Sequence, residues 1–156
     1  MKPSWKTYHI EAWEHGVAGC SPRTSPVPKD RFLWNDLGIC TNPHVFGVAA
    51  KGWRIRIYTA QNKRGRWVAG ADVSFLNAGY GYGVLNVDAD SFPAELGAKA
   101  RELRRAALWV EKWASRTYAS CPIPPGQANE ALRLISEALE IVEPKKVPVY
   151  TQLSLF

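Results

Sequence analysis

The segment Trp53–Tyr58 constrains the fold of this chain most strongly, because large apolar residues alternate in it with two arginines and a final tyrosine. A period of two is typical of a β-strand with one buried and one exposed face. The tryptophan and the two isoleucines of the segment are predicted to face the core. The opposite face is then expected to expose Arg54, Arg56 and Tyr58.

The residues that follow predict a small antiparallel sheet. Residues 61–65 (QNKRG) have the composition of a turn, so the strands on either side, 53–58 and 66–76, are predicted to pair as a β-hairpin. A further turn is expected at residues 77–81, where glycine recurs, and a third strand at residues 82–87. The segments together predict an antiparallel meander.

The hydrophobic period changes from two to that of a helix after residue 90. Between residues 93 and 116 the apolar positions are spaced by three and four, which predicts one buried helix face. These positions are Leu96, Ala100, Leu103, Ala107, Val110 and Ala114. After a break at residues 122–126 the same spacing recurs over residues 127–142, at Ala128, Leu132, Ile135, Leu139 and Val142.

We therefore predict an α+β fold, a small antiparallel β-meander of about three strands packed against two C-terminal helices. A single basic domain is expected over residues 1–143, since this length and a hydrophobic content of 46% support a core. Residues 1–50 are rich in proline and are predicted to be irregular, with a short strand at Tyr8–Trp13. Residues 144–156 are expected to form an extended tail, because two prolines restrict them, although the same stretch also suits a final strand.

Composition limits the partners and the compartment of the protein. The chain has 20 basic and 14 acidic residues, a net charge of +6 that favours polyanions such as DNA. Three widely spaced cysteines do not suggest a disulfide framework. We find no apolar run long enough for a signal peptide or a membrane span. A cytoplasmic, nucleoid-associated protein without membrane contact is expected.

The basic hairpin is the predicted nucleic-acid-binding site. Cations that neutralise phosphates and aromatic rings that stack on bases commonly occur together on such surfaces. The candidate residues are Arg54, Arg56, Tyr58, Lys63, Arg64 and Arg66. A second basic stripe, diluted by glutamates, runs along the first helix at Arg101, Arg105, Lys112 and Arg116. Either group also suits a solvated face without a ligand.

Four carboxylates near strand ends and a helix start offer an enzymatic alternative. Asp72, Asp88, Asp90 and Glu95 would hold divalent ions for phosphodiester cleavage if the fold brought them together. The non-catalytic interpretation is that Asp72 pairs with Arg54 across the hairpin and Asp90 caps the helix. We favour a protein without catalytic residues and keep the nuclease as the alternative.

Metal and cofactor sites are not predicted. Cys40 and His44 are four residues apart, but structural zinc usually needs two close pairs of ligands. The remaining candidates, dispersed along the chain, are His9, His15, Cys20 and Cys121. Residues 79–83 (GYGYG) lack the lysine and hydroxyl residue of a phosphate-binding loop.

The last five residues of the sequence carry the clearest motif. They are Gln152, Leu153, Ser154, Leu155 and Phe156. An extended peptide with apolar anchors of this kind is suited to a hydrophobic pocket on a partner. The pentapeptide resembles the motif with which bacterial replication and repair proteins bind the sliding clamp, the β subunit of DNA polymerase III.

The resemblance implies a role for each position. Gln152 would enter a small subsite, and Leu155 and Phe156 would fill a hydrophobic pocket on a clamp protomer. Leu153 and Ser154 would supply spacing and backbone contacts. The alternative is that the apolar residues of the motif pack back onto their own domain.

Three functional hypotheses follow. The first is a clamp-binding accessory protein of DNA replication or repair, which recruits its basic body to DNA or competes for the clamp pocket. Competition would suit a modulator of host replication encoded by a phage, plasmid or other mobile element. The second is a clamp-recruited, metal-dependent nuclease, and the third is a nucleic-acid-binding module whose tail is structural.

Overall fold

The computed structural model describes residues 2–9, 31–76, 78–87, 90–114 and 123–143. Its strands are β1 (Lys6–His9), β2 (His44–Ala50), β3 (Trp53–Gln61), β4 (Trp67–Phe75) and β5 (Ala78–Tyr82). Its helices are α1 (Glu95–Ala114) and α2 (Pro125–Val142). The predicted α+β class is confirmed, but the sheet has five strands where about three were predicted.

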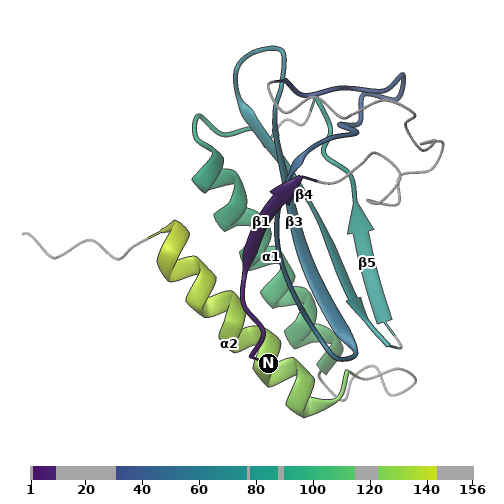
Figure 1. Ribbon diagram of the computed structural model, residues 1–156, viewed down its shortest axis with the longest axis vertical. Coiled ribbons are helices and arrows are strands. Elements are labelled where there is room, and N and C mark those ends of the chain that lie inside the picture. The colour runs from purple at the N-terminus through teal and green to yellow at the C-terminus, as the bar shows by residue number, and fades with distance from the viewer. Residues whose placement is uncertain (1, 10–30, 77, 88–89, 115–122, 144–156) are drawn as a thin grey trace, which may run out of the picture.

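All five strands form one antiparallel sheet in the order β1-β2-β3-β4-β5, so each pairs with the next along the chain (Figure 1). The predicted hairpin is β3 and β4, which pair from Trp53 opposite Phe75 to Gln61 opposite Trp67. Its turn is held by Asn62, whose side-chain oxygen accepts hydrogen bonds from the backbone of residues 64 and 66.

The first fifty residues supply two strands, β1 and β2. The strand expected at Tyr8–Trp13 begins earlier, as β1 at Lys6–His9, and residues 10–13 lie outside the described part of the chain. In β2, residues 45–48 are all buried. A strand that is covered on both faces shows no alternation of polarity, and this explains why β2 escaped detection.

The position of β5 corrects the prediction of a turn at residues 77–81 and a strand at residues 82–87. Two glycines suggested the turn, but they lie within β5 because they allow close pairing with β4. A Cβ atom on Gly79 would lie 3.1 Å from the carbonyl oxygen of Val73, and one on Gly81 would lie 3.3 Å from that of Ala71. Glycine there marks a close backbone approach.

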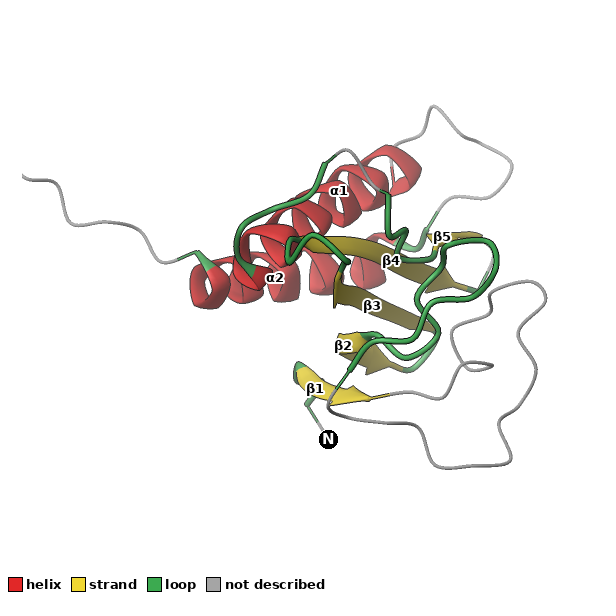
Figure 2. Cartoon of the chain, turned by 90° about the horizontal axis from the view of Figure 1, so that it is seen from above, coloured by secondary structure: helices red, strands yellow, loops and turns green. Residues whose placement is uncertain are grey.

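The helices lie side by side on one face of the sheet (Figure 2) and confirm the two helices predicted. They enclose the main core with the inward residues of the central strands, among them Ile55, Ile57, Leu103, Val110 and Ile135. Leu96 was predicted to face this core but is 52% exposed. The buried face of α1 instead includes Ala98 and Ala106, whose small side chains let the helix approach its neighbours.

The other face of the sheet is covered in part by a second apolar cluster, which we call the loop-side cluster. It contains Cys40, Val45, Tyr58, Ala60, Val68 and Val84, with Phe32 and Trp34 packed against it. Tyr58 was predicted to be exposed, but only 1% of its surface is accessible. The strand pattern could not show this cover, because it comes from loop segments distant in sequence.

In the described part of the chain, neither α1 nor α2 is long and apolar enough to cross a membrane. The N-terminal segment is tied to the helices, since the indole nitrogen of Trp5 donates a hydrogen bond to the carbonyl oxygen of Leu134 (2.8 Å). The Trp5 ring also stacks on Phe46 of β2. Residues 2–9 therefore belong to the same folded body as β2 and α2.

Candidate nucleic-acid interface

The face of the sheet opposite the two helices is only partly covered by the loop-side cluster. Its uncovered part carries basic residues of the predicted interface, and we call it the open face. Direct cross-strand partners point to the same side of a sheet. One row of partners runs from Lys6 through Gly47 and Arg56 to Asp72, and the next from Ala49 through Arg54 to Ser74. These seven residues define the open face.

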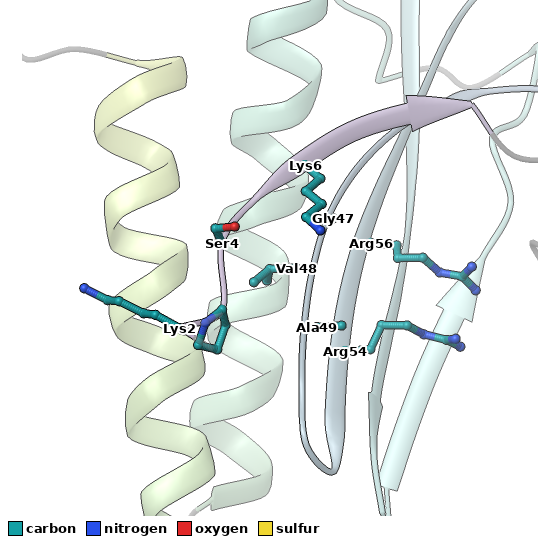
Figure 3. Close-up of a pocket in the computed structure, with 9 residues that line it drawn as sticks. Lys2, Ser4, Lys6, Gly47, Val48, Ala49, Arg54 and Arg56 are labelled. Atoms are coloured by element: carbon teal, nitrogen blue, oxygen red, sulfur yellow. The ribbon is translucent and has the colours of Figure 1, made fainter.

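A pocket of about 390 Å³ lies on the open face, between the N-terminal segment and β2 and β3 (Figure 3). Lys6, Arg54 and Arg56 are among its lining residues, together with the small residues Gly47 and Ala49. Figure 3 shows the Lys6 side chain reaching towards Gly47, whereas the Lys2 side chain extends away towards α2. We therefore leave Lys2 out of the site.

Asp72 fixes the two arginines of the open face. Its Oδ2 atom accepts hydrogen bonds from Nε and Nη2 of Arg56, at 3.0 and 2.7 Å. The same oxygen lies 3.1 Å from Nη2 of Arg54. This geometry confirms the predicted pairing of Asp72 with Arg54. Two guanidinium groups share one carboxylate oxygen, so the group keeps a net positive charge.

Burial distinguishes the two arginines. The Arg56 side chain is 11% exposed and the Arg54 side chain 48% exposed. The Arg56 guanidinium also lies over the Tyr58 ring, 5.6 Å from its centre. Arg56 therefore belongs to the framework of the face, while Arg54 presents its charge outward.

The other basic residues of the predicted interface lie elsewhere. Lys63 and Arg64 are in the β3–β4 turn, beyond the end of β3 at Gln61. Gln61 is five residues from Arg56 and seven from Arg54, so at about 3.3 Å per residue the strand separates the turn from the two arginines by roughly 17–23 Å. Arg66 donates hydrogen bonds to Oγ (2.8 Å) and the carbonyl oxygen (3.0 Å) of Ser91. The structure thus brings Arg54 and Arg56 together with Lys6, which sequence reasoning missed because residues 1–50 were predicted to be irregular.

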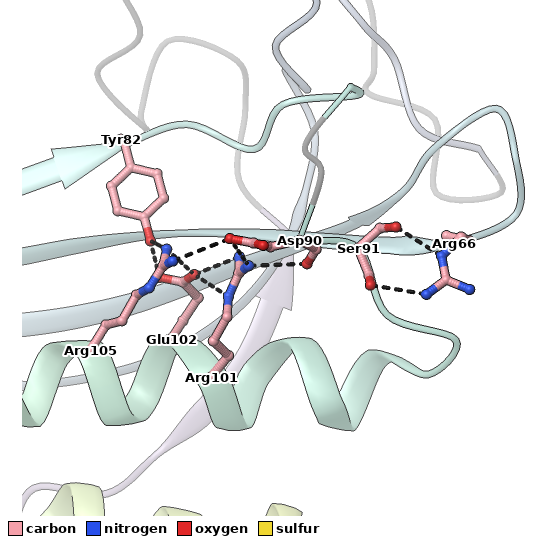
Figure 4. A network of polar contacts seen from close by, with 7 residues as sticks. All are labelled: Arg66, Tyr82, Asp90, Ser91, Arg101, Glu102 and Arg105. Atoms are coloured by element: carbon pink, nitrogen blue, oxygen red, sulfur yellow. Dashed lines mark hydrogen bonds and ion pairs between the residues drawn. The ribbon is translucent and has the colours of Figure 1, made fainter.

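The basic stripe on α1 takes part in an internal network beneath β5 (Figure 4). Glu102 is fully buried, and its carboxylate accepts hydrogen bonds from Nε of Arg101 (3.0 Å), from Arg105 and from the hydroxyl of Tyr82. Both arginines also pair with Asp90. Arg101 and Arg105 compensate a buried carboxylate, which gives these two residues of the stripe a structural role. Arg116 lies outside the described residues.

Burial and the Glu102 carboxylate also act on the two tyrosines of β5. Burial, followed by the hydrogen bond to Glu102, raises the pKa of Tyr82. Burial, followed by the charge of Glu102, raises the pKa of Tyr80 to about 12. Both tyrosines face α1, because they pair with Ala71 and Val73, which belong to the main core. They are therefore not stacking residues of the open face.

The three carboxylates of the nuclease hypothesis that the structure describes are not brought together by the fold. Glu95 accepts hydrogen bonds from Thr59 (2.7 Å) and pairs with Nδ1 of His44 (2.8 Å), and both partners lie on the helix side of the sheet. Asp72 lies on the open face, so the sheet separates it from Glu95. Asp90 does not cap α1, as was predicted, because the helix begins only at Glu95; it pairs instead with Arg101 and Arg105. Asp88 is outside the described residues. Within the described ranges no group of three potential ligands could hold a metal ion.

The surroundings of Glu95 and Cys40 shift the pKa values of both groups. Burial alone would raise the pKa of Glu95, but hydrogen bonds from His44 and Thr59 and the charge of Lys99 outweigh it and lower the pKa. Burial raises the pKa of the Cys40 thiol to about 12, so the group stays protonated at neutral pH. A protonated, buried thiol is a poor metal ligand.

No known protein family, curated protein or solved structure matches this chain. The clamp-binding residues predicted at positions 152–156 lie outside the described residues, as do Cys20, Cys121 and His15. The open face is therefore characterised from its own geometry.

Proposed function

We propose that the protein is a sliding-clamp-binding accessory protein that acts at sites of DNA replication or repair. The observation that carries the proposal is the QLSLF sequence at positions 152–156. The main core ends with Val142 of α2, and the following N–H group, that of Glu143, bonds to the carbonyl oxygen of Leu139. Residues 143–151 are long enough to extend by up to about 30 Å, which supports presentation of the motif to a partner.

The motif has the chemistry of a modest, reversible anchor. Burying Leu155 and Phe156 in a pocket would contribute roughly 1.5–3 kcal/mol each. Ordering the peptide opposes much of this gain, so one tail alone is expected to bind weakly or moderately. The clamp is a ring with repeated pockets, and a second contact with DNA would increase the residence time by avidity.

The body of the protein supports the DNA side of this function. Lys6, Arg54 and Arg56 place three cations around one pocket on a net-positive chain. In the recruiting form of the proposal, the tail holds this surface close to DNA that passes through the clamp. In the competing form, a mobile element would use the same tail to displace host proteins from the clamp. Both forms place the protein in the cytoplasm, at the nucleoid.

Calorimetric titration with purified bacterial clamp tests the proposal. The full-length protein is expected to bind, and the Leu155→Ala/Phe156→Ala variant is expected to lose binding by at least about tenfold, because both anchors are truncated. A matched control is Leu108→Ala/Ile141→Ala, which truncates two exposed apolar side chains on the helices and should bind like the wild type. Equal binding by the anchor variant, or no binding by the wild type, would refute the proposal.

A further inference from the structure

The pocket of the open face concentrates cations over a floor with almost no side chains. Lys6, Gly47 and Arg56 are successive cross-strand partners on β1, β2 and β3. The backbones of β1 and β3 are about 9.5 Å apart at the usual strand spacing. Glycine at the middle position leaves room for the Lys6 side chain, which reaches towards it, while the Arg54 and Arg56 side chains extend away from Gly47 to Asp72 on β4 (Figure 3). Ala49 adds only a methyl group.

The charges of the site are organised before any ligand arrives. Lys6, Arg54 and Arg56 carry three positive charges against the single negative charge of Asp72. Because Asp72 holds both guanidinium groups at one oxygen, little side-chain entropy remains to be lost when an anion binds. An anion with several oxygens, such as a phosphate, can accept hydrogen bonds from a guanidinium fork and an ammonium group together.

The described lining of the pocket contains no aromatic ring. Tyr58, which the sequence placed among the arginines, is buried in the loop-side cluster. Tyr80 is directed to α1, where its ring contacts Trp109. A surface without stacking platforms does not hold bases by their faces, so recognition there depends on the phosphate backbone.

We propose that this pocket binds the phosphodiester backbone of DNA without regard to base sequence. Lys6 and Arg54 contact the phosphate oxygens. Asp72 holds Arg54 in position, and the charge of Arg56 adds to the positive potential of the pocket. Lys63 and Arg64 in the distant turn lie outside this site. The inference rests on the DNA side of the proposed function and does not depend on the QLSLF motif.

Fluorescence anisotropy with a labelled oligonucleotide of mixed sequence tests the inference, with single-stranded and duplex forms as separate arms. In Lys6→Gln/Arg54→Gln, we expect about tenfold weaker binding or more at low salt. The slope of log affinity against log salt should become shallower by about 1.4 for a single strand or about 1.8 for a duplex, as two phosphate contacts are lost. A change in base sequence should leave the affinity of the wild type unchanged.

The matched control is Lys63→Gln/Arg64→Gln, which removes the same charge from the β3–β4 turn. Its salt slope should remain that of the wild type. If the two double variants lose affinity and slope equally, the protein attracts DNA by net charge alone, and the inference is wrong. It is also wrong if the wild type does not bind either form of DNA.

Asp72→Asn provides a test in the opposite direction. The side-chain oxygen of asparagine can still accept a hydrogen bond from Arg56, so the arginines keep a partner while the only carboxylate among the described residues of the open face is lost. DNA binding should then become about fivefold stronger, the effect of one unit charge at about 4 Å in water. A purely structural role for the cluster predicts unchanged or weaker binding. Thermal unfolding of each variant shows that the fold is retained.

The inference and the proposed function fail in different measurements. If DNA binding is absent while the clamp titration succeeds, the pocket has no phosphate role and the clamp proposal stands. If DNA binding depends on Lys6 and Arg54 while the clamp titration fails, the pocket is confirmed and the clamp proposal is wrong.

Discussion

The two faces of the sheet differ in how they are covered. The face towards α1 and α2 is packed along its length by a single core that includes Ile55 and Ile57. The opposite face is divided, with Tyr58 under the loop-side cluster and Arg54 and Arg56 on the open face. The two helices cover the main core on one face, whereas the loop cover leaves part of the other face accessible for binding.

Substitution of Tyr58 gives the largest expected effect and tests whether the loop-side cluster is a true core. Because the ring is almost fully buried, Tyr58→Ala should lower the free energy of unfolding by about 4 kcal/mol. Urea denaturation measures this change. A loss below about 0.5 kcal/mol would mean that the residue is exposed, as its place in the strand alternation suggested.

Ile57→Ala tests the face towards the helices. The side chain is completely buried in the main core, so its truncation should cost about 3 kcal/mol in the same denaturation experiment. Arg54→Ala, on the same strand but on the open face, serves as the control. Its half-exposed ion pair should contribute less than about 1 kcal/mol. Similar losses in both variants would contradict the contrast between the faces.

Alkaline pH should weaken the helix-covered face through Tyr80. Its pKa is raised from 10.0 to about 12 in the folded protein, so the folded state retains a proton that the unfolded state releases. The stability that this shift contributes is present below pH 10 and is lost as the pH rises towards about 12. Unfolding measured over this range should show a smaller decline in Tyr80→Phe. An identical decline would contradict the shift.

The smallest expected effect is a loss of folding stability at acidic pH through Glu95. The hydrogen bonds from His44 and Thr59 lower its pKa below 4.5, so the folded state binds the proton less readily than the unfolded state. The associated stability is present above pH 4.5 and is lost as the pH falls through the lowered pKa. Glu95→Gln should therefore lose less stability on acidification than the wild type. Parallel acid denaturation curves would argue against this contact.

The fold could be predicted wherever one face of an element is apolar and the other polar. The β3–β4 hairpin and both helices met this condition, and their existence was predicted correctly. In β2 this condition fails, because residues 45–48 are all buried. In β5 the glycines that allow close strand pairing were interpreted as a turn. Tyr58 was misplaced because its cover comes from segments that only the tertiary fold brings close.

The candidate site could be predicted only in part for the same reason. Arg54 and Arg56 were identified from their place on β3, and the pairing of Asp72 with Arg54 was foreseen. Lys6 could not be found, since it precedes the strand expected at Tyr8–Trp13 and reaches the site only through pairing with β2, which the sequence patterns did not reveal. Lys63 and Arg64 were included because they are near in sequence, although the length of the hairpin places them at its other end.

A competition experiment tests the central claim, clamp docking through QLSLF, most directly. A synthetic peptide covering residues 144–156 is titrated into a complex of the full-length protein and purified bacterial clamp, with a peptide carrying Leu155→Ala/Phe156→Ala as control. We predict that the native peptide displaces the protein and that the substituted peptide does not. Failure of the native peptide to displace the protein, or equal displacement by both peptides, would contradict the claim.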